Sequence, residues 1–191
     1  MSEKPTLDSA QSAAAPNRRP TRTCILLCLL ALGYGTAAVA EQDEPAAILE
    51  FGVVPNRSLT EHTWSAGPTA AIEVTPIEHW LELEAGVTFV RAHGSTEFDT
   101  DLLFKKPWTL SKRLEVMAGI GPEWVHTQEN GRAANALGGE AAVDFMFWPF
   151  AKRRFGWYAE PALDYRFGNV HEMSFGISAG LLIGVGGSRR K

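Results

Sequence analysis

Apolar and polar side chains alternate through eight short segments of this chain, which follow one another between residues 48 and 185. In the third segment, Leu81 and Leu83 have one parity whereas Glu82 and Glu84 have the other. Successive side chains of a β-strand point to opposite faces, so each segment is expected to be a strand with one apolar face. Segments of about ten alternating residues between turn signals are typical of a transmembrane β-barrel. The expected strands are residues 48–54, 68–75, 79–90, 96–105, 114–125, 138–147, 157–167 and 173–185.

A positively charged stretch precedes a short apolar run near the N-terminus. Arg18, Arg19 and Arg22 come before the apolar residues 24–32, a run too short to span a bilayer as a helix. An Ala-Val-Ala pattern ends at Ala40, so these features predict a secretory signal peptide and Sec-type export. The expected organisation is a signal peptide at 1–40, a periplasmic segment at 41–47, a barrel at 48–185 and a basic tail at 186–191.

Charge and cysteine usage narrow the possible classes of function. Cys24 and Cys28 are the two cysteines of the chain and both lie in the predicted signal peptide, so no disulfide or thiol chemistry is expected in the mature protein. The chain carries a formal net charge of −4, and removal of the basic leader makes the remainder more acidic. This balance argues against nucleic acid as a partner. No later apolar run is long enough for a membrane helix, so a membrane location requires a closed barrel.

Alternation alone does not tell which face of the barrel is outside. A soluble lipocalin-like barrel has the same period with its apolar face inward, and this stays an alternative. Here the polar face has almost no lysine, and aromatic residues collect at the strand ends as they do at membrane interfaces. These two features favour an apolar face in contact with outer-membrane lipid. The expected membrane-interface aromatics are Trp80, Trp108, Trp148 and Trp157.

Four histidines lie in or near the connections that are expected to face outward, at residues 55–67, 91–95, 126–137 and 168–172. These histidines are His62, His93, His126 and His171. Four imidazoles around one rim could bind a divalent transition metal. Their spacing matches no known ligand motif, however, and chance placement on polar loops is the competing interpretation.

Three motifs carry a resemblance to a known class: HWLELEAG at residues 79–86, DLLFKKP at 101–107 and DFMFWP at 144–149. With them, the chain resembles the small OmpA/OmpX-type eight-stranded outer-membrane barrels, and a proteobacterial group within that class, over nearly all of residues 46–185. The resemblance implies a closed antiparallel up-and-down eight-stranded transmembrane β-barrel in the outer membrane of a Gram-negative bacterium. It also implies the barrel-assembly machinery as a partner during biogenesis. The three motifs say nothing about catalytic or binding chemistry.

The polar face, which would line the lumen, is rich in carboxylates and poor in cations. Lys105 and Arg166 are the basic residues expected inside. Crowded carboxylates in a narrow lumen cannot all be ionised, so some must share protons, bind cations or contact arginines. One interpretation is a structural plug with buried water, and another is a lumen that binds or weakly conducts divalent cations. The expected acidic cluster is Glu82, Glu84, Glu97, Asp99, Asp101, Glu115, Glu140, Asp144, Glu160 and Asp164, and Glu50, Glu73 and Glu123 share its face.

An enzyme that modifies lipid A is the remaining alternative. Its candidate residues are the neighbours His126 and Thr127, and the pair His171 and Ser174. Thr127 is a poor nucleophile without a positioned base, and residues three apart on a strand point to opposite faces. We therefore expect a non-enzymatic protein without a cofactor, in a structural or surface-interaction role.

Overall fold

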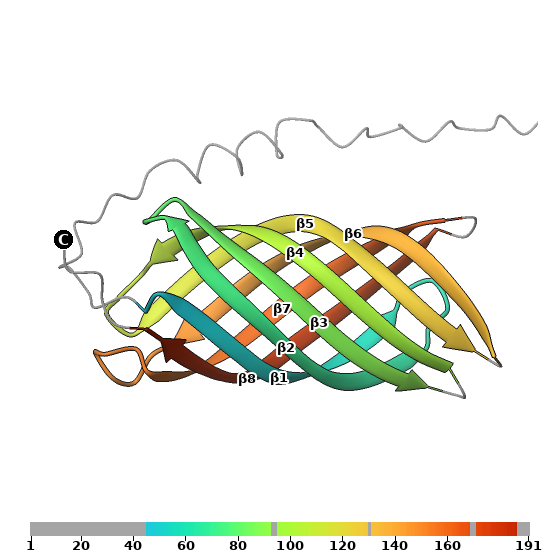
Figure 1. The fold of residues 1–191 in the computed structure, drawn as a ribbon, viewed down its shortest axis with the longest axis horizontal. Coiled ribbons are helices and arrows are strands. Elements are labelled where there is room, and N and C mark those ends of the chain that lie inside the picture. Colours follow the sequence, from blue (N-terminus) through green and yellow to red (C-terminus); the bar gives the residue numbers. More distant parts are fainter. Residues whose placement is uncertain (1–44, 93–94, 130, 169–170, 187–191) are drawn as a thin grey trace, which may run out of the picture. The chain divides into compact units, whose positions relative to one another are not determined.

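The computed structural model describes residues 45–92, 95–129, 131–168 and 171–186. Each strand pairs antiparallel with the next, and β1 pairs with β8, so the sheet closes into a barrel (Figure 1). The predicted eight-stranded up-and-down barrel is thereby confirmed. None of the described residues forms a helix long and apolar enough to cross a membrane. The strands are β1 (Ala47–Ser58), β2 (Trp64–Ile77), β3 (Leu81–Ala92), β4 (Ser95–Thr109), β5 (Leu114–Glu129), β6 (Arg132–Phe147), β7 (Phe155–Phe167) and β8 (Glu172–Val185).

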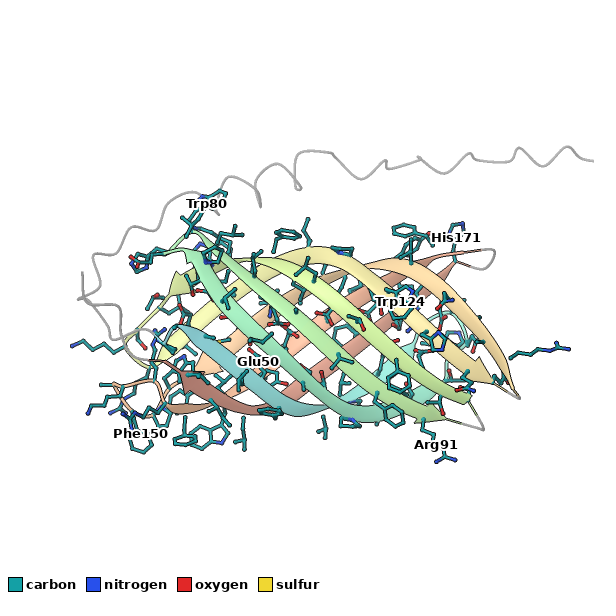
Figure 2. All side chains as sticks on the ribbon, in the orientation of Figure 1. Glu50, Trp80, Arg91, Trp124, Phe150 and His171 are labelled. Carbon is teal, nitrogen blue, oxygen red and sulfur yellow. The ribbon has the colours of Figure 1, made fainter. Side chains whose placement is uncertain are left out.

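The barrel has two distinct ends, which we call the base and the mouth. At the base β1 begins and β8 ends, with Ala47 paired to Val185. At the mouth lie the connections that follow β1, β3, β5 and β7. Figure 2 shows Trp80 and Phe150 at the base, and Arg91 and His171 at the mouth. The predicted signal peptide, His93 and residues 187–191 lie outside the described residues.

The strands reach further toward the mouth than predicted, so the connections there are shorter. Residues 126–137 were expected to form a connection, whereas β5 and β6 pair up to Glu129 and Arg132. Gly131 has a φ of +75°, which is the left-handed conformation that tight hairpin turns require. The Asn-Gly pair at this point is the sequence signal for such a hairpin. The weak alternation of the polar residues around it led to the wrong boundary.

Burial alternates along the strands and separates an outer apolar face from an inner face. On β5, the outward Ile120 is 68% exposed whereas the inward Met117 is 0% exposed. On β1, Phe51 and Val53 point outward and are exposed, whereas Glu50 points into the lumen and is buried. The prediction that the apolar face points outward is confirmed, which is the reverse of a soluble lipocalin-like barrel.

Exposed aromatic residues lie near both ends of the outer face. At the base Phe147 stacks on Trp157, with ring centroids 5.9 Å apart. At the mouth Phe89 meets Phe98 edge to face at 5.0 Å, and Trp124 is exposed nearby along the rim (Figure 2). Girdles at both ends are characteristic of membrane barrels. Trp80, Trp108 and Trp157 lie on the outer face, and so do the mouth aromatics Trp64 and Trp124, which were not among the expected interface aromatics.

Trp148 was wrongly predicted to be an interface aromatic. Its side chain is 0% exposed and packs inside the base. Trp148 directly follows β6, which ends at Phe147, and it keeps the inward parity of Asp144 and Met146 on that strand. Its backbone N–H donates to the carbonyl of Arg113, so the pairing of β5 with β6 continues one residue past Phe147. The residue joins an apolar cluster that closes the base, made of Ile48, Met117, Met146, Trp148, Tyr158 and Leu182.

Candidate functional site

The lumen collects the carboxylates that the alternation placed on the inner face. All ten residues of the predicted acidic cluster lie there, and Glu50, Glu73 and Glu123 lie there too, each buried. Of the ten, Glu97, Asp99, Asp101 and Glu140 are half-buried. The others, which are buried, are Glu82, Glu84, Glu115, Asp144, Glu160 and Asp164.

Lys105 on β4 is the cation at the centre of the lumen. Its ammonium group donates hydrogen bonds to Glu84 on β3 and Glu160 on β7. Nζ also lies 3.6 Å from Oδ2 of Asp144 on β6, and the lysine side chain is 0% exposed. One positive charge thus connects three carboxylates from three other strands. The arrangement fastens opposite walls of the barrel to one another.

Arg166 on β7 likewise binds carboxylates from several strands, nearer the mouth. Its guanidinium lies 2.6 Å from Oε1 of Glu97, 3.5 Å from Oδ1 of Asp99 and 3.9 Å from Oε1 of Glu123. A fourth carboxylate, Glu172 at the start of β8, lies 3.5 Å away. The single guanidinium therefore spans β4, β5 and β8. Lys105 and Arg166 thus both lie among the carboxylates of the lumen.

Arg153 is a third lumen cation, and the sequence analysis missed it. It lies in the connection between β6 and β7 with a φ of 45°, and its side chain enters the base of the barrel. Nη1 lies 2.6 Å from Oε2 of Glu115, and the guanidinium carbon lies 5.8 Å from the ring centroid of Trp148. No strand period exists in this connection, so nothing in the alternation could place Arg153 inside.

A cavity of about 60 Å³ lies in the lumen and is lined by members of both the Lys105 and the Arg166 networks. This volume holds a few water molecules. Its polar lining includes Tyr158 and Ser178, and no lysine or arginine lines it among the described residues. The carboxylates that line it are Glu50, Glu84, Asp99, Asp101, Glu123, Glu140, Glu160 and Asp164.

The described histidines of the mouth take separate partners. Nδ1 of His126 lies 2.8 Å from Oδ1 of Asn135, and Nδ1 of His171 lies 3.0 Å from the hydroxyl of Tyr165. His62 lies in the connection after β1, with a φ of 59°. Within the described part of the chain, no histidine belongs to a group of three or more ligand side chains at metal-binding distance.

The two residue pairs considered for lipid chemistry point to opposite sides of the barrel wall. Thr127 donates a hydrogen bond of 3.3 Å to Glu97 in the lumen, while its neighbour His126 contacts Asn135 and Trp124 on the outer face. Ser174 is buried and donates to Asp164 at 2.9 Å, while His171 is exposed. A hydroxyl and an imidazole are therefore not within hydrogen-bonding reach in either pair.

Comparisons with solved structures find barrels of the same kind. Neisserial surface protein A is similar over 75% of this chain and 99% of its own, with 10% identity and a TM-score of 0.62. The N-terminal β-barrel domain of Pseudomonas aeruginosa OprF is similar over 74% of this chain and 100% of its own, with 14% identity and a TM-score of 0.51. The chain has the fold of the small eight-stranded outer-membrane β-barrels. No family model and no curated protein sequence matches it.

Proposed function

We propose that the protein is a non-enzymatic outer-membrane β-barrel of a Gram-negative bacterium, with a structural role and a lumen closed by its own side chains. The observation that carries the proposal is the separation of the two faces. Apolar side chains such as Ile120 and Phe51 cover the outer surface, and the buried charged groups lie inside. Only a closed barrel satisfies its backbone hydrogen bonds in lipid by strand pairing.

The dimensions of the strands support insertion in a bilayer. A tilted strand needs about 9–11 residues to cross the hydrocarbon core. The strands contain between 12 and 16 residues, enough to cross and to extend past each aromatic girdle. The predicted signal peptide at residues 1–40 supports Sec-type export, after which the barrel-assembly machinery would insert the protein.

The contents of the lumen support a closed barrel over an open pore. Lys105 joins β3, β4, β6 and β7 in mid-lumen, and the Trp148 cluster fills the base. The lumen cavity of about 60 Å³ holds only a few water molecules, and side chains from both charge networks line it. Eight-stranded barrels are commonly filled by side chains in this way.

The short connections at the mouth favour a structural role over a large binding surface. Residues 59–63 join β1 to β2, and two residues separate β5 from β6. Outer-membrane barrels that present a binding surface do so with longer extracellular loops. The separation of the hydroxyl and imidazole groups in both candidate pairs supports a non-enzymatic role as well.

The location is tested by expressing the full chain in a Gram-negative host and fractionating the cells. We expect the protein in the outer membrane, beginning at Glu41, and running faster on a gel when it is not boiled. Recovery in the soluble periplasm, or an exported form that begins at Met1, would refute the proposal.

The closed lumen is tested by conductance of the purified protein in planar bilayers. We expect no stable single-channel conductance from the parent protein. A steady cation conductance would instead support the alternative of a conducting barrel. The measurement is made on protein whose mobility shift on a gel confirms that it is folded.

A further inference from the structure

Four carboxylates from four strands meet in the half of the lumen that is nearer the base. Glu73 on β2 pairs directly with Glu84 on β3, and Ile48 pairs with Glu73, so Glu50 lies two residues further along β1. Asp144 belongs to β6, a strand that pairs with none of these three. One carboxylate oxygen from each of Glu50, Glu73, Glu84 and Asp144 lies within 4.8 Å of all the others. We call these residues the four-carboxylate group, and Figure 2 shows Glu50 within the barrel.

Several oxygens of this group lack a partner although they are fully buried. Both carboxylate oxygens of Glu73, Oδ1 of Asp144 and Oε1 of Glu50 have no hydrogen-bond donor among the described residues, and Oδ2 of Asp144 has only the Lys105 ion pair at 3.6 Å. The exposure of these three side chains is at most 1%. Buried carboxylates without donors are strongly unfavourable, so this arrangement requires a positively charged or proton-bearing occupant.

Lys105 supplies only part of the positive charge that these buried carboxylates require. Its ammonium group contacts Glu84 and Asp144 within the group, and Glu160 beside it. Oε1 of Glu50 on β1 and both carboxylate oxygens of Glu73 on β2 accept no hydrogen bond from this ammonium group. Two like charges placed directly opposite on neighbouring strands, as Glu73 and Glu84 are, destabilise a sheet unless something lies between them.

We propose that the four-carboxylate group binds one Ca²⁺-like divalent cation beside the Lys105 ammonium. Hard oxygen ligands suit Ca²⁺, Mg²⁺ and Mn²⁺, whereas zinc and copper favour nitrogen and sulfur. Oxygens bound to one Ca²⁺ at about 2.3–2.6 Å lie up to about 5 Å apart. The separations of up to 4.8 Å therefore fit this ion without movement of the strands.

The neighbouring cavity has room for water ligands, which would complete the coordination that the four side chains begin. Ca²⁺ takes about six to eight oxygen ligands, and bidentate carboxylates or water complete the number. The cavity is lined by Glu50 and Glu84, so water inside it reaches two members of the group. A cation held there connects the β1–β3 wall to β6. It would bind the folded barrel alone and stabilise it by mass action.

The first experiment is calorimetric titration of CaCl₂ into the chelator-treated protein, purified in detergent after expression of the full chain. We expect one saturable site per barrel and a rise in the unfolding temperature with Ca²⁺. Mg²⁺ and Zn²⁺ are run in parallel, and we expect both to bind more weakly. Absence of saturable Ca²⁺ binding to the folded parent would overturn the proposal.

The second experiment compares Glu73→Gln and Asp144→Asn, which lie on opposite walls, with the control Glu123→Gln. Each of the first two should raise the Ca²⁺ dissociation constant at least about tenfold, because the number of ligand charges sets the affinity. Glu123 is also a buried lumen carboxylate but lies in the Arg166 network, so its variant should stay within about twofold of the parent. Parent-like affinity in Glu73→Gln, or an equal loss in the control, would overturn the proposal.

Folding and location are read separately from ion binding. The gel shift of unboiled protein shows whether each variant forms the barrel, and if Asp144→Asn does not fold, Glu73→Gln decides the matter. The cation site requires the closed barrel but neither the membrane location nor the structural role. A failed titration on a correctly located, folded protein therefore counts against the cation site alone.

Discussion

Arg153 enters the base of the barrel from the connection between β6 and β7 and places Nη1 2.6 Å from Oε2 of Glu115 on β5. Both side chains are buried, and the guanidinium lies beside the ring of Trp148. A connection thus supplies the counter-charge that the strands lack at this end. The pair closes the base both electrostatically and by packing, since Trp148 belongs to the apolar cluster there.

Replacing Arg153 by alanine should destabilise the folded barrel by about 3–5 kcal/mol, because it leaves the buried Glu115 without its cation. The exposed neighbour Lys152 is the control, and its alanine variant should change stability by less than about 0.5 kcal/mol. Denaturant unfolding in lipid vesicles measures both. Equal stability of the two variants would show that the Arg153–Glu115 pair contributes nothing.

Lys105→Met should be destabilising by a similar amount, about 3–5 kcal/mol, since one ammonium serves Glu84, Glu160 and Asp144. Adding Glu160→Gln removes one of the stranded charges and should recover part of the loss. A double-mutant cycle on these two positions measures their coupling. Independent, additive effects would mean that Lys105 does not hold Glu160 in the folded barrel.

The fold and the membership of the lumen were predictable because a strand has a fixed period. Once Leu83 and Glu84 are on opposite faces, the side chains on the rest of that strand are assigned with them. The pairing of neighbouring strands was likewise implied by the up-and-down order. Glu73 and Glu84 could therefore be expected to share one wall.

Contacts across the lumen were not predictable in this way. The approach of Asp144 to Glu50 depends on the tilt and register of all eight strands, which no single segment encodes. The position of Arg153 depends on a connection that has no period, whereas the inward position of Trp148 continues the parity of Asp144 and Met146, and that signal was overlooked. The hairpin at Gly131 did have a local signal in its Asn-Gly pair, and that signal was passed over.

Arginine at mid-barrel on the outer face should impair insertion and stability. Ile120→Arg and Leu83→Arg each place a charge in the hydrocarbon region and should cost about 2–4 kcal/mol. Ala133, exposed next to the hairpin tip at the mouth, is the matched control. Ala133→Arg should cost about 0–1 kcal/mol, as charges near the interface do. Folding yield into vesicles and denaturant unfolding test the orientation of the barrel, which would be refuted by equal behaviour of all three variants.

Tryptophans of the outer face and the buried Trp148 should behave differently in a lipid-quenching experiment. Trp80, Trp124 and Trp157 are between 44% and 60% exposed on the outer face, so brominated lipids should quench their fluorescence strongly. Trp148 is enclosed by Met117, Met146 and the rest of the base cluster, so a variant that retains it alone should be quenched little. Its emission should also move to longer wavelength in Arg153→Ala, because loss of the guanidinium admits water to the base. Strong quenching of Trp148 by lipid would place it on the outer face, where it was expected as an aromatic at a strand end, and would contradict the closed base.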